Sequence, residues 1–166
     1  MEATDRSTTR LRVALISTSD TLELRHAVLR PGFPIGDCEF PGDDAPTTLH
    51  VGALLDDEIV AVGSLYLEAR PVDAPGGAPR TADHDAGTAW RLRGMATSPK
   101  VRRRGAGAAT LRAMHEHAQH HGGSLLWCNA RLGAVRFYEA QGWQVLGTEF
   151  EIPSVGPHLV MERRLG

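Results

Sequence analysis

A strand, a glycine-rich turn and a helix follow one another between residues 90 and 121, and this order constrains the fold more than any other segment. The strand-like run WRLRGMAT ends before Ser98 and Pro99, because proline has no N–H group for a sheet hydrogen bond. The turn then holds three basic residues and two glycines: Arg102, Arg103, Arg104, Gly105 and Gly107. Backbone N–H groups at the start of the following helix, together with the positive end of its dipole, can hold a phosphate or a pyrophosphate.

Other glycine-rich phosphate loops do not fit this turn. A Walker A loop is excluded because no Gly-Lys-Ser/Thr closes the turn, and GxGxxG does not match because Ala108, Ala109 and Thr110 follow Gly107. Taken alone, the turn is also compatible with a tight connection that carries solvated arginines. A second motif is therefore needed to choose between these interpretations.

Two motifs together resemble the GNAT superfamily of N-acetyltransferases. The spacing Arg-x-x-Gly-x-Gly after a strand is similar to the acyl-CoA signature of that family, and LLWCNA followed by AVRFYEAQGW is similar to its second motif, in which Tyr-Glu-x-x-Gly follows a strand. The order of elements fits this family from about residue 10 to residue 165. The resemblance implies acetyl-CoA as the acyl donor, held by Met95, Ala96, Thr97, Arg102, Arg103, Arg104, Gly105, Ala106, Gly107 and Ala108.

The resemblance also implies a mechanism. An amine attacks the thioester directly and Tyr138 gives a proton to the departing thiolate, although this tyrosine could instead only pack at the sheet edge. Family members often carry a glutamate that relays the amine proton, in the central strand or at the head of the next one. Arg91, Arg93 and Leu126 occupy those places here, and Arg131 replaces the asparagine that often precedes the tyrosine helix. The resemblance therefore leaves the general base unassigned.

Candidate acceptor residues come from an acidic loop and from the last two strands. Residues 31–46 form a loop dense in proline, glycine and aspartate, and its carboxylates make the most acidic cluster of the chain. Such a loop can attract the ammonium group of a small primary amine, or it can simply be solvated. A histidine in the last strand can act as a base near neutral pH. The residues predicted to contact the acceptor are Glu39, Asp43, Asp44, Glu151 and His158.

Composition and charge narrow the class of protein. The 166 residues suit one domain (10–166) after a flexible leader (1–9), and 42% hydrophobic with 23% charged residues is ordinary for a soluble globular protein. A net charge of −2 argues against nucleic acid as a partner. No apolar run is long enough for a membrane span, and Cys38 and Cys128 suggest no disulfide framework. We therefore expect a cytoplasmic protein without membrane contacts, for which a homodimer is one option.

Periodicity and turn signals predict the order β-α-β-β-β-α-β-α-β-β. This order indicates an α/β fold with a GNAT-like mixed, mostly antiparallel sheet, central splayed parallel strands and helices on both faces. Gly94 stands inside the central strand, where glycine often marks a bulge or a close approach by a ligand. Two helices are predicted at 105–121 and 132–141.

Three local features carry further expectations. Leu11, Val13 and Leu15 alternate with Arg12 and Ala14, which predicts a half-buried first strand. Ser19 or Asp20 can cap the first helix, with Glu23 three residues after Asp20 to close a capping box. Leu24, Ala27 and Val28 then share one apolar face of this helix. Residues 69–86 are poor in apolar side chains and are predicted to form a mobile loop.

Two other residue types have simple interpretations. His115, His117, His120 and His121 crowd the helix after the turn, but no cysteine or carboxylate joins them at the spacing of a metal site, so no metal is predicted. Cys128 is expected to be a buried, inert thiol. The alternative to an enzyme is a non-catalytic acyl-CoA-binding sensor or regulatory module, and turnover of acetyl-CoA with amines separates the two.

Overall fold

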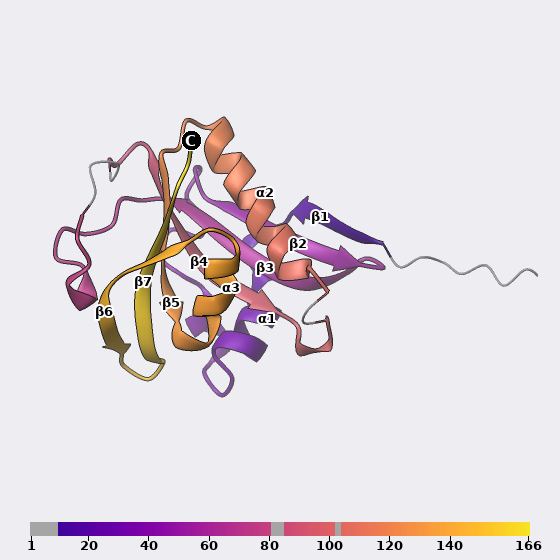
Figure 1. Ribbon diagram of the computed structural model, residues 1–166. Coiled ribbons are helices and arrows are strands. Elements are labelled where there is room, and N and C mark those ends of the chain that lie inside the picture. The colour runs from indigo at the N-terminus through magenta and orange to yellow at the C-terminus, as the bar shows by residue number, and fades with distance from the viewer. Residues whose placement is uncertain (1–9, 81–84, 102–103) are drawn as a thin grey trace, which may run out of the picture.

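The computed structural model describes residues 10–80, 85–101 and 104–166, which form a twisted sheet with helices packed on it (Figure 1). The strands are β1 (Leu11–Leu15), β2 (Leu49–Leu55), β3 (Glu58–Leu67), β4 (Ala89–Thr97), β5 (Leu125–Arg131), β6 (Gln144–Ile152) and β7 (Gly156–Arg164). The α-helices are α1 (Thr18–Leu24), α2 (Ala106–His120) and α3 (Val135–Ala140). Five short helical turns complete the order: η1 (Arg25–Leu29), η2 (Ile35–Cys38), η3 (Pro75–Gly77), η4 (Pro99–Val101) and η5 (Leu132–Ala134). The predicted order of strands and α-helices is confirmed.

The sheet has seven strands in the order β1-β2-β3-β4-β5-β7-β6. Every neighbouring pair is antiparallel except β4 and β5, which run parallel at the centre. That parallel pair is short, because its register runs only from Ala89 opposite Leu125 to Arg91 opposite Trp127. Beyond Arg91 the two strands diverge. The prediction of a mostly antiparallel sheet with splayed central parallel strands is therefore confirmed.

Gly94 forms the predicted bulge in β4. Val62 of β3 pairs with Ala96 and Ser64 pairs with Arg93, so two residues of β4 lie opposite one residue of β3. Gly94 has a φ of 66°, which side chains disfavour, and a Cβ atom there would lie 2.9 Å from Nε of Arg25. Both the backbone conformation and the lack of space require glycine at this position.

One face of the sheet packs against α2 and α3. Leu111, Met114 and Ala118 on the predicted apolar face of α2 are buried against Leu92 of β4. The helix ends at His121, and Gly122 follows with a φ of 70°, as expected for a glycine C-cap. This layer forms the main hydrophobic core.

The other face of the sheet contacts α1 and η1 through a buried polar network. Arg25 on η1 is fully buried, and its Nη1 and Nη2 atoms donate to the two carboxylate oxygens of Asp43 at 2.7 and 3.0 Å. Nη2 also donates to Ser64 at 2.8 Å, and the Tyr66 hydroxyl and the Phe40 N–H group donate to the same carboxylate. Burial alone would raise the pKa of Asp43, but hydrogen bonds from Arg25, Tyr66 and Phe40 lower it overall. The network ties η1 and the acidic loop to β3.

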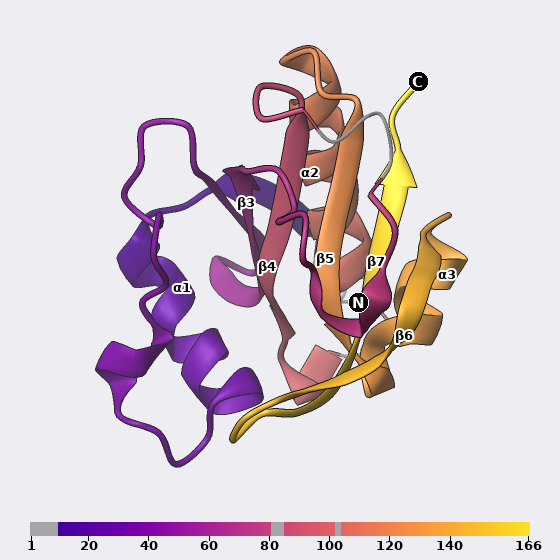
Figure 2. The same ribbon diagram turned by 90° about the vertical axis from the view of Figure 1, so that its left-hand side faces the viewer.

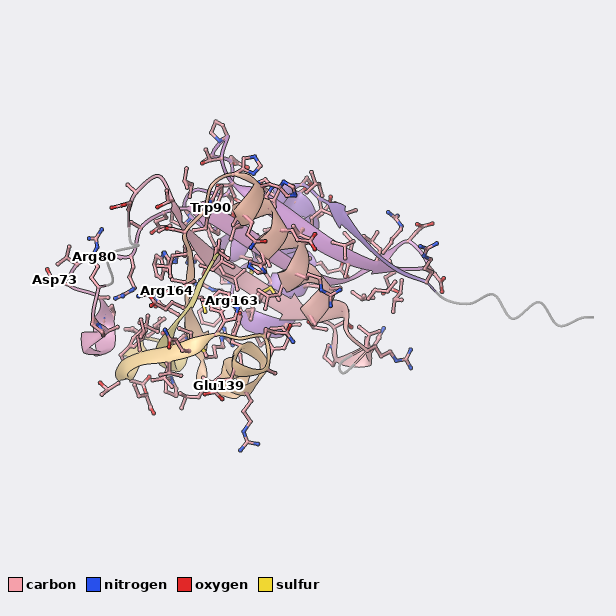
Figure 3. All side chains as sticks on the ribbon, turned by 45° about the horizontal axis from the view of Figure 1, so that its top comes forward. Asp73, Arg80, Trp90, Glu139, Arg163 and Arg164 are labelled. Carbon is pink, nitrogen blue, oxygen red and sulfur yellow. The ribbon has the colours of Figure 1, made fainter. Side chains whose placement is uncertain are left out.

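The segment between β3 and β4 covers the rest of this face. Trp127 of β5 donates through Nε1 to the Glu68 carbonyl at 2.7 Å, and the backbone around Gly76 meets Thr148 of β6. In Figure 2 this segment runs in front of β5 and β7, while α2 lies behind them. In Figure 3 its labelled residues Asp73 and Arg80 lie well away from Trp90. The sequence did not predict these contacts with β6, which involve Gly76 and Ala78. The mobility of residues 69–86, of which 81–84 lie outside the described residues, stays a prediction.

The start of the first helix differs from the prediction. Ser17, rather than Ser19 or Asp20, is the N-cap, and Asp20 closes the capping box by accepting from the Ser17 N–H group at 3.0 Å. The polar residues Thr21 and Arg25, not an apolar stripe, form the buried face. The α-helix is followed directly by η1, which is a π-helix.

The first strand also differs from the prediction, because β1 is an edge strand. Val13 and Leu15 are exposed instead of half-buried, with Leu15 at 73% exposure. Among the described helices, none is long and apolar enough to cross a membrane.

The variant Asp43→Asn tests the buried ion pair. Amide replacement leaves the Arg25 charge buried without a counter-ion, and breaking a buried pair in this way typically costs about 3–5 kcal/mol. We expect a loss of that order in the free energy of unfolding, measured by urea denaturation at pH 7. Asp44→Asn is the matched control, because Asp44 is exposed and its carboxylate bonds, among the described residues, only the Thr18 hydroxyl. Equal stability of the two variants would contradict the assignment.

The same pair predicts a dependence of stability on pH. Because the pKa of Asp43 is lower in the folded chain than its unfolded value of about 3.9, its stabilisation is present above that value. It is lost as the pH falls through the folded pKa. The difference in unfolding free energy between the parent and Asp43→Asn should therefore be constant from pH 5 to 7 and shrink below about pH 4. A difference in unfolding free energy that stays constant at all these pH values would contradict the predicted contribution of Asp43.

Candidate active site

A cleft of about 780 Å³ opens where β4 and β5 diverge. Its walls come from both strands, from the first turn of α2, from α3, from η1 and from the β6–β7 hairpin. The lining residues include 28–30, 40, 91–95, 97, 101, 105–108, 128–131, 133, 134, 137, 138, 141, 152, 155 and 158. The divergence of two central strands therefore brings together residues from both halves of the chain.

The start of α2 provides free backbone donors at one end of the cleft. Gly105 is the N-cap with a φ of 82°, and the helical ladder begins where Ala109 donates to the Gly105 carbonyl at 2.9 Å. The N–H groups of Ala106, Gly107 and Ala108 precede that bond and meet no acceptor among the residues that the structure describes. The helix dipole adds positive potential at the same place. These groups can hold a phosphate, as the sequence predicts.

Gly107 allows α2 to begin close to the end of β4. A Cβ atom on Gly107 would lie 3.0 Å from Oγ1 of Thr97 and 3.6 Å from the Phe137 ring. Even a methyl group would therefore crowd the wall that carries the free N–H groups. Of the predicted basic residues, Arg104 is exposed, and Arg102 and Arg103 lie outside the described residues.

The part of β4 that follows Arg91 forms one wall of the cleft. Met95 and Thr97 line it, whereas the Ala96 side chain is buried at 3% exposure on the other side of the wall. Because the register with β5 stops at Arg91, the edge of β4 that faces β5 has no strand partner from there on. Backbone groups of this segment are available to a ligand that lies between the strands.

Tyr138 lines the opposite wall and is 5% exposed. Its ring packs between Phe137 and Trp143, with ring centroids 5.2 and 5.1 Å away. The turn after α3 fixes this position, because Gly142 adopts a φ of 86° and the Trp143 N–H group donates to the Tyr138 carbonyl at 3.1 Å. Burial, with a smaller contribution from Cys128, raises the pKa of Tyr138 well above its ordinary value. The phenol is therefore held in its protonated form.

Cys128 lies in the cleft wall next to Tyr138, but its environment does not favour a nucleophile. The side chain is 3% exposed, and burial raises the pKa of the thiol far above its ordinary range. A thiol that stays protonated is a poor nucleophile. This geometry agrees with the prediction of a buried, inert cysteine.

His158 on β7 is the one predicted acceptor residue that lines the cleft. It is 4% exposed, and its Nδ1–H group donates to the Gly156 carbonyl at 2.8 Å. This bond fixes the tautomer, so Nε2 carries the lone pair. Burial lowers the pKa of His158 and outweighs the opposing effect of the Gly156 bond, while Arg131 lowers it further. The imidazole is therefore a neutral acceptor at pH 7.

The four predicted carboxylates do not line this cleft. Glu39, Asp43 and Asp44 border a separate pocket of about 380 Å³ near the start of α1, and Glu151 is exposed on β6. The Asp43 carboxylate is already bound by Arg25, so it is not free to bind an ammonium group. The acidic loop is thus a structural partner of Arg25, which stands 18 positions away in the sequence.

Sequence reasoning did not assign the arginines of the cleft to any ligand. Arg30, Arg91, Arg93 and Arg131 all line it. The available signal was the alternation RLR in the central strand, because residues two apart in a strand share a face. With Leu92 packed against α2, Arg91 and Arg93 must point to the opposite face.

The histidine-rich helix shows ring packing instead of a metal-binding arrangement. The rings of His117 and His121 stack with centroids 4.1 Å apart, and both lie against Trp90. Nδ1–H of His121 donates to the His117 carbonyl at 2.8 Å. No group of three or more potential ligands that could hold a metal ion occurs within the described parts of the chain. The absence of a metal stays a prediction.

Comparison with known proteins decides the family. The model of the acetyltransferase (GNAT) family matches residues 17–143. The chain belongs to this family. It is 33% identical over 155 residues to YitI, an uncharacterized N-acetyltransferase of Bacillus subtilis (strain 168), and the match covers 93% of this chain and 97% of that protein. The chain is thus a GNAT N-acetyltransferase, and acetyl-CoA is the donor that this family uses. The enzyme is favoured over the non-catalytic sensor.

Solved structures show the same fold in enzymes with different acceptors. An aminoglycoside 6'-N-acetyltransferase in complex with coenzyme A matches with a TM-score of 0.68 at 13% identity, covering 92% of this chain and 96% of that one. The ribosomal-protein-S18-alanine N-acetyltransferase from Escherichia coli matches with a TM-score of 0.65 at 16% identity, covering 95% of each chain. One name specifies a small molecule and the other a protein. The shared fold therefore does not identify the acceptor of this GNAT enzyme.

The variant Gly107→Glu tests the phosphate-binding turn. It adds a bulky side chain and a negative charge beside the free N–H groups, so we expect coenzyme A to bind at least tenfold more weakly in isothermal titration calorimetry. Gly36→Glu is the control, because a side chain at Gly36 meets open space outside the cleft. If the Gly107→Glu variant is folded and binds coenzyme A as tightly as the parent, the phosphates do not bind at the start of α2.

Proposed function

We propose that this GNAT enzyme transfers an acetyl group from acetyl-CoA to the primary amine of a small molecule, with Tyr138 as general acid and His158 as general base. The observation that carries this proposal is the shared cleft. The free N–H groups of α2, the unpaired edge of β4, a protonated phenol and a neutral imidazole all border the same space. Phosphate binding, carbonyl polarisation and proton transfer can therefore occur in one site.

The donor side of the cleft fits acetyl-CoA. When bound, acetyl-CoA supplies an acetyl group that is activated as a thioester. The N–H groups of Ala106, Gly107 and Ala108 would hold its pyrophosphate, and the backbone at Met95 and Thr97 would contact the pantetheine arm. This approach of the pyrophosphate requires that residue 107 has no side chain, as is the case for glycine.

Tyr138 is suited to donate a proton. The hydroxyl meets no hydrogen-bond partner among the residues that the structure describes, and its raised pKa keeps it protonated until the thiolate forms. The proton on Oη can then pass to the departing thiolate, because the burial that raises the pKa of the phenol also raises that of the thiol, which is about 8.5 in water. A positioned acid of this kind typically increases the rate by a factor of about 10²–10⁴.

His158 is suited to accept a proton from the attacking amine. Its Nδ1–H group is engaged by Gly156, so Nε2 is the atom that can take the proton. The ring lies beside Phe150, with centroids 5.9 Å apart, which limits its rotation. This role fills the place of the glutamate that the family often carries in its central strand.

A small molecule is the better acceptor class on steric grounds. Concave sites for small ligands typically measure about 300–1,000 Å³, and the cleft of about 780 Å³ must hold the thioester arm as well. η1 and the β6–β7 hairpin both border its acceptor side. A compact amine fits the remaining space better than an extended polypeptide.

Removing the phenol proton with Tyr138→Phe tests the general acid. We expect kcat to fall at least tenfold, because the thiolate then leaves without its proton donor. The affinity for coenzyme A and the melting temperature serve as controls and should stay close to those of the parent. A kcat within about twofold of the parent would contradict the role of Tyr138.

The variant His158→Asn tests the general base through its pH profile. The pKa of His158 lies below 6.5, so the parent should keep its advantage in kcat/KM over the variant at all pH values above about 6.5. As the pH falls further, His158 takes up a proton and the ratio of parent to variant kcat/KM should shrink. A ratio that does not change with pH would assign the residue a structural role.

A further inference from the structure

The charged side chains that line the cleft are all basic. Four arginines border it, and no aspartate or glutamate does so among the described residues. We infer that the acceptor carries an anionic oxygen group, a carboxylate or a phosphate, in addition to its amine, and that Arg93 and Arg131 bind this group. This inference rests on the proposed transfer to an amine and specifies the class of that amine.

Arg93 is the central residue of the anion site. Its guanidinium lies over the Phe40 ring, with Cζ 4.3 Å from the ring centroid, and the side chain is half-buried. No hydrogen-bond acceptor for it occurs among the residues that the structure describes. A planar guanidinium with free N–H groups matches a carboxylate or phosphate through two parallel hydrogen bonds. Arg93 is therefore oriented by Phe40 but not neutralised.

Arg131 and Arg30 place two further positive charges on the same side. Arg131 donates through Nη2 to the Leu29 carbonyl, and Arg30 donates through Nη1 to the Asp37 carbonyl at 2.9 Å. Both partners are neutral carbonyls, so neither guanidinium is balanced by a carboxylate there. Arg30 also lies over the Phe40 ring at 5.3 Å. The three side chains converge on the gap between η1, β4 and β5.

Two other arginines in or near the cleft already have counter-ions. Arg25 is paired with Asp43 at 2.7 Å, and Arg91 is paired with Glu68 at 3.2 Å. Burial, followed by the nearby Arg91, lowers the pKa of Arg93, and burial, followed by Arg30, lowers that of Arg131. The protein therefore holds Arg93 and Arg131 at a cost that comes first from burial and then from charge repulsion, although Tyr66 and Glu68 oppose this effect at Arg93. An anionic ligand would relieve that cost.

The phosphates of acetyl-CoA do not account for these arginines. Leu92 packs against α2 in the hydrophobic core, and its neighbour Arg93 points to the opposite face of the sheet. The N–H groups proposed for the pyrophosphate belong to the first turn of α2. The arginines instead face η1, where Arg30 and Phe40 cover the sheet. The anion site thus lies on the acceptor side of the cleft.

The anion site also lies beside the proposed base. Arg131 on β5 is directly opposite His158 on β7, and residues opposite each other in an antiparallel pair share a face. An acceptor held by its anionic group at Arg131 and Arg93 would present its amine close to Nε2 of His158. Arg93 and Arg131 are accordingly substrate-binding residues, and they position the amine without taking part in proton transfer.

Matched acceptors test the inference directly. The panel pairs amino acids with their carboxamides and O-phosphoethanolamine with ethanolamine, so that each pair differs mainly in the anionic group. We expect the anionic member of at least one pair to show a kcat/KM at least tenfold higher. Preference for the amino acid identifies a carboxylate, and preference for O-phosphoethanolamine identifies a phosphate. Equal use of both members in every pair would overturn the inference.

The variant Arg93→Met locates the anion site. It keeps an unbranched, flexible side chain but removes the guanidinium and its charge. We expect KM for the anionic acceptor to rise at least tenfold and the preference for the anionic over the uncharged partner to be lost, while KM for acetyl-CoA stays close to that of the parent. Arg93→Lys should recover part of the loss, and Arg112→Met, exposed on α2, is the control. Equal effects on the charged and uncharged acceptors would contradict the assignment.

A binding measurement separates this inference from the proposed function. If no amine supports turnover of acetyl-CoA, the proposed transfer fails, and calorimetry of the same anionic amines with the protein and coenzyme A decides the anion site. Binding that is lost in Arg93→Met supports the site. Binding that is unchanged in the variant, or absent for every anionic amine in the panel, overturns it.

Discussion

The divergence of β4 from β5 is the constraint on which the rest of the structure depends. Three residue pairs join these parallel strands before they separate, and the Gly94 bulge bends β4 just beyond the last pair. A longer parallel ladder would fill the space between the strands with hydrogen bonds. The short ladder instead leaves backbone groups of β4 exposed to a cleft at the centre of the sheet. Enzyme chemistry in this chain is possible because its sheet is incomplete there.

Two arginines that contact Phe40 differ in how their charge is balanced. Arg25 is paired with Asp43 and also bound by Ser64, so its function is to join η1, the acidic loop and β3. Arg93 contacts the same ring and has no carboxylate partner among the described residues. A buried ion pair contributes a defined geometry, whereas a guanidinium without a counter-ion can contribute affinity for an anion. The same aromatic ring therefore contacts a structural arginine and the arginine that we propose to bind the acceptor.

The sequence predicted those parts of the site that depend on neighbouring residues. Gly94, the turn at Gly105 and Gly107, and the Tyr138 segment each lie within one local pattern, and local backbone conformation largely decides where they go. The pairing of Asp43 in the acidic loop was not predicted, because it depends on Arg25, a distant residue whose burial no periodicity indicates. Similarly, the Ser17 cap and the packing of residues 70–78 on β6 depend on contacts that form only in the folded chain. Long-range polar contacts, more than secondary structure, set the limit of prediction.

The two sides of the cleft differ in the kind of atoms that form them. The donor side consists of main-chain groups on β4 and at the start of α2, and these change little when a side chain is replaced. The acceptor side consists of side chains carried by η1, by the outer face of β4 and β5, and by the β6–β7 hairpin. With the donor and acceptor sides as we propose them, mutation can alter the acceptor without disturbing the donor. This division gives a physical reason why enzymes that share one fold can differ in what they acetylate.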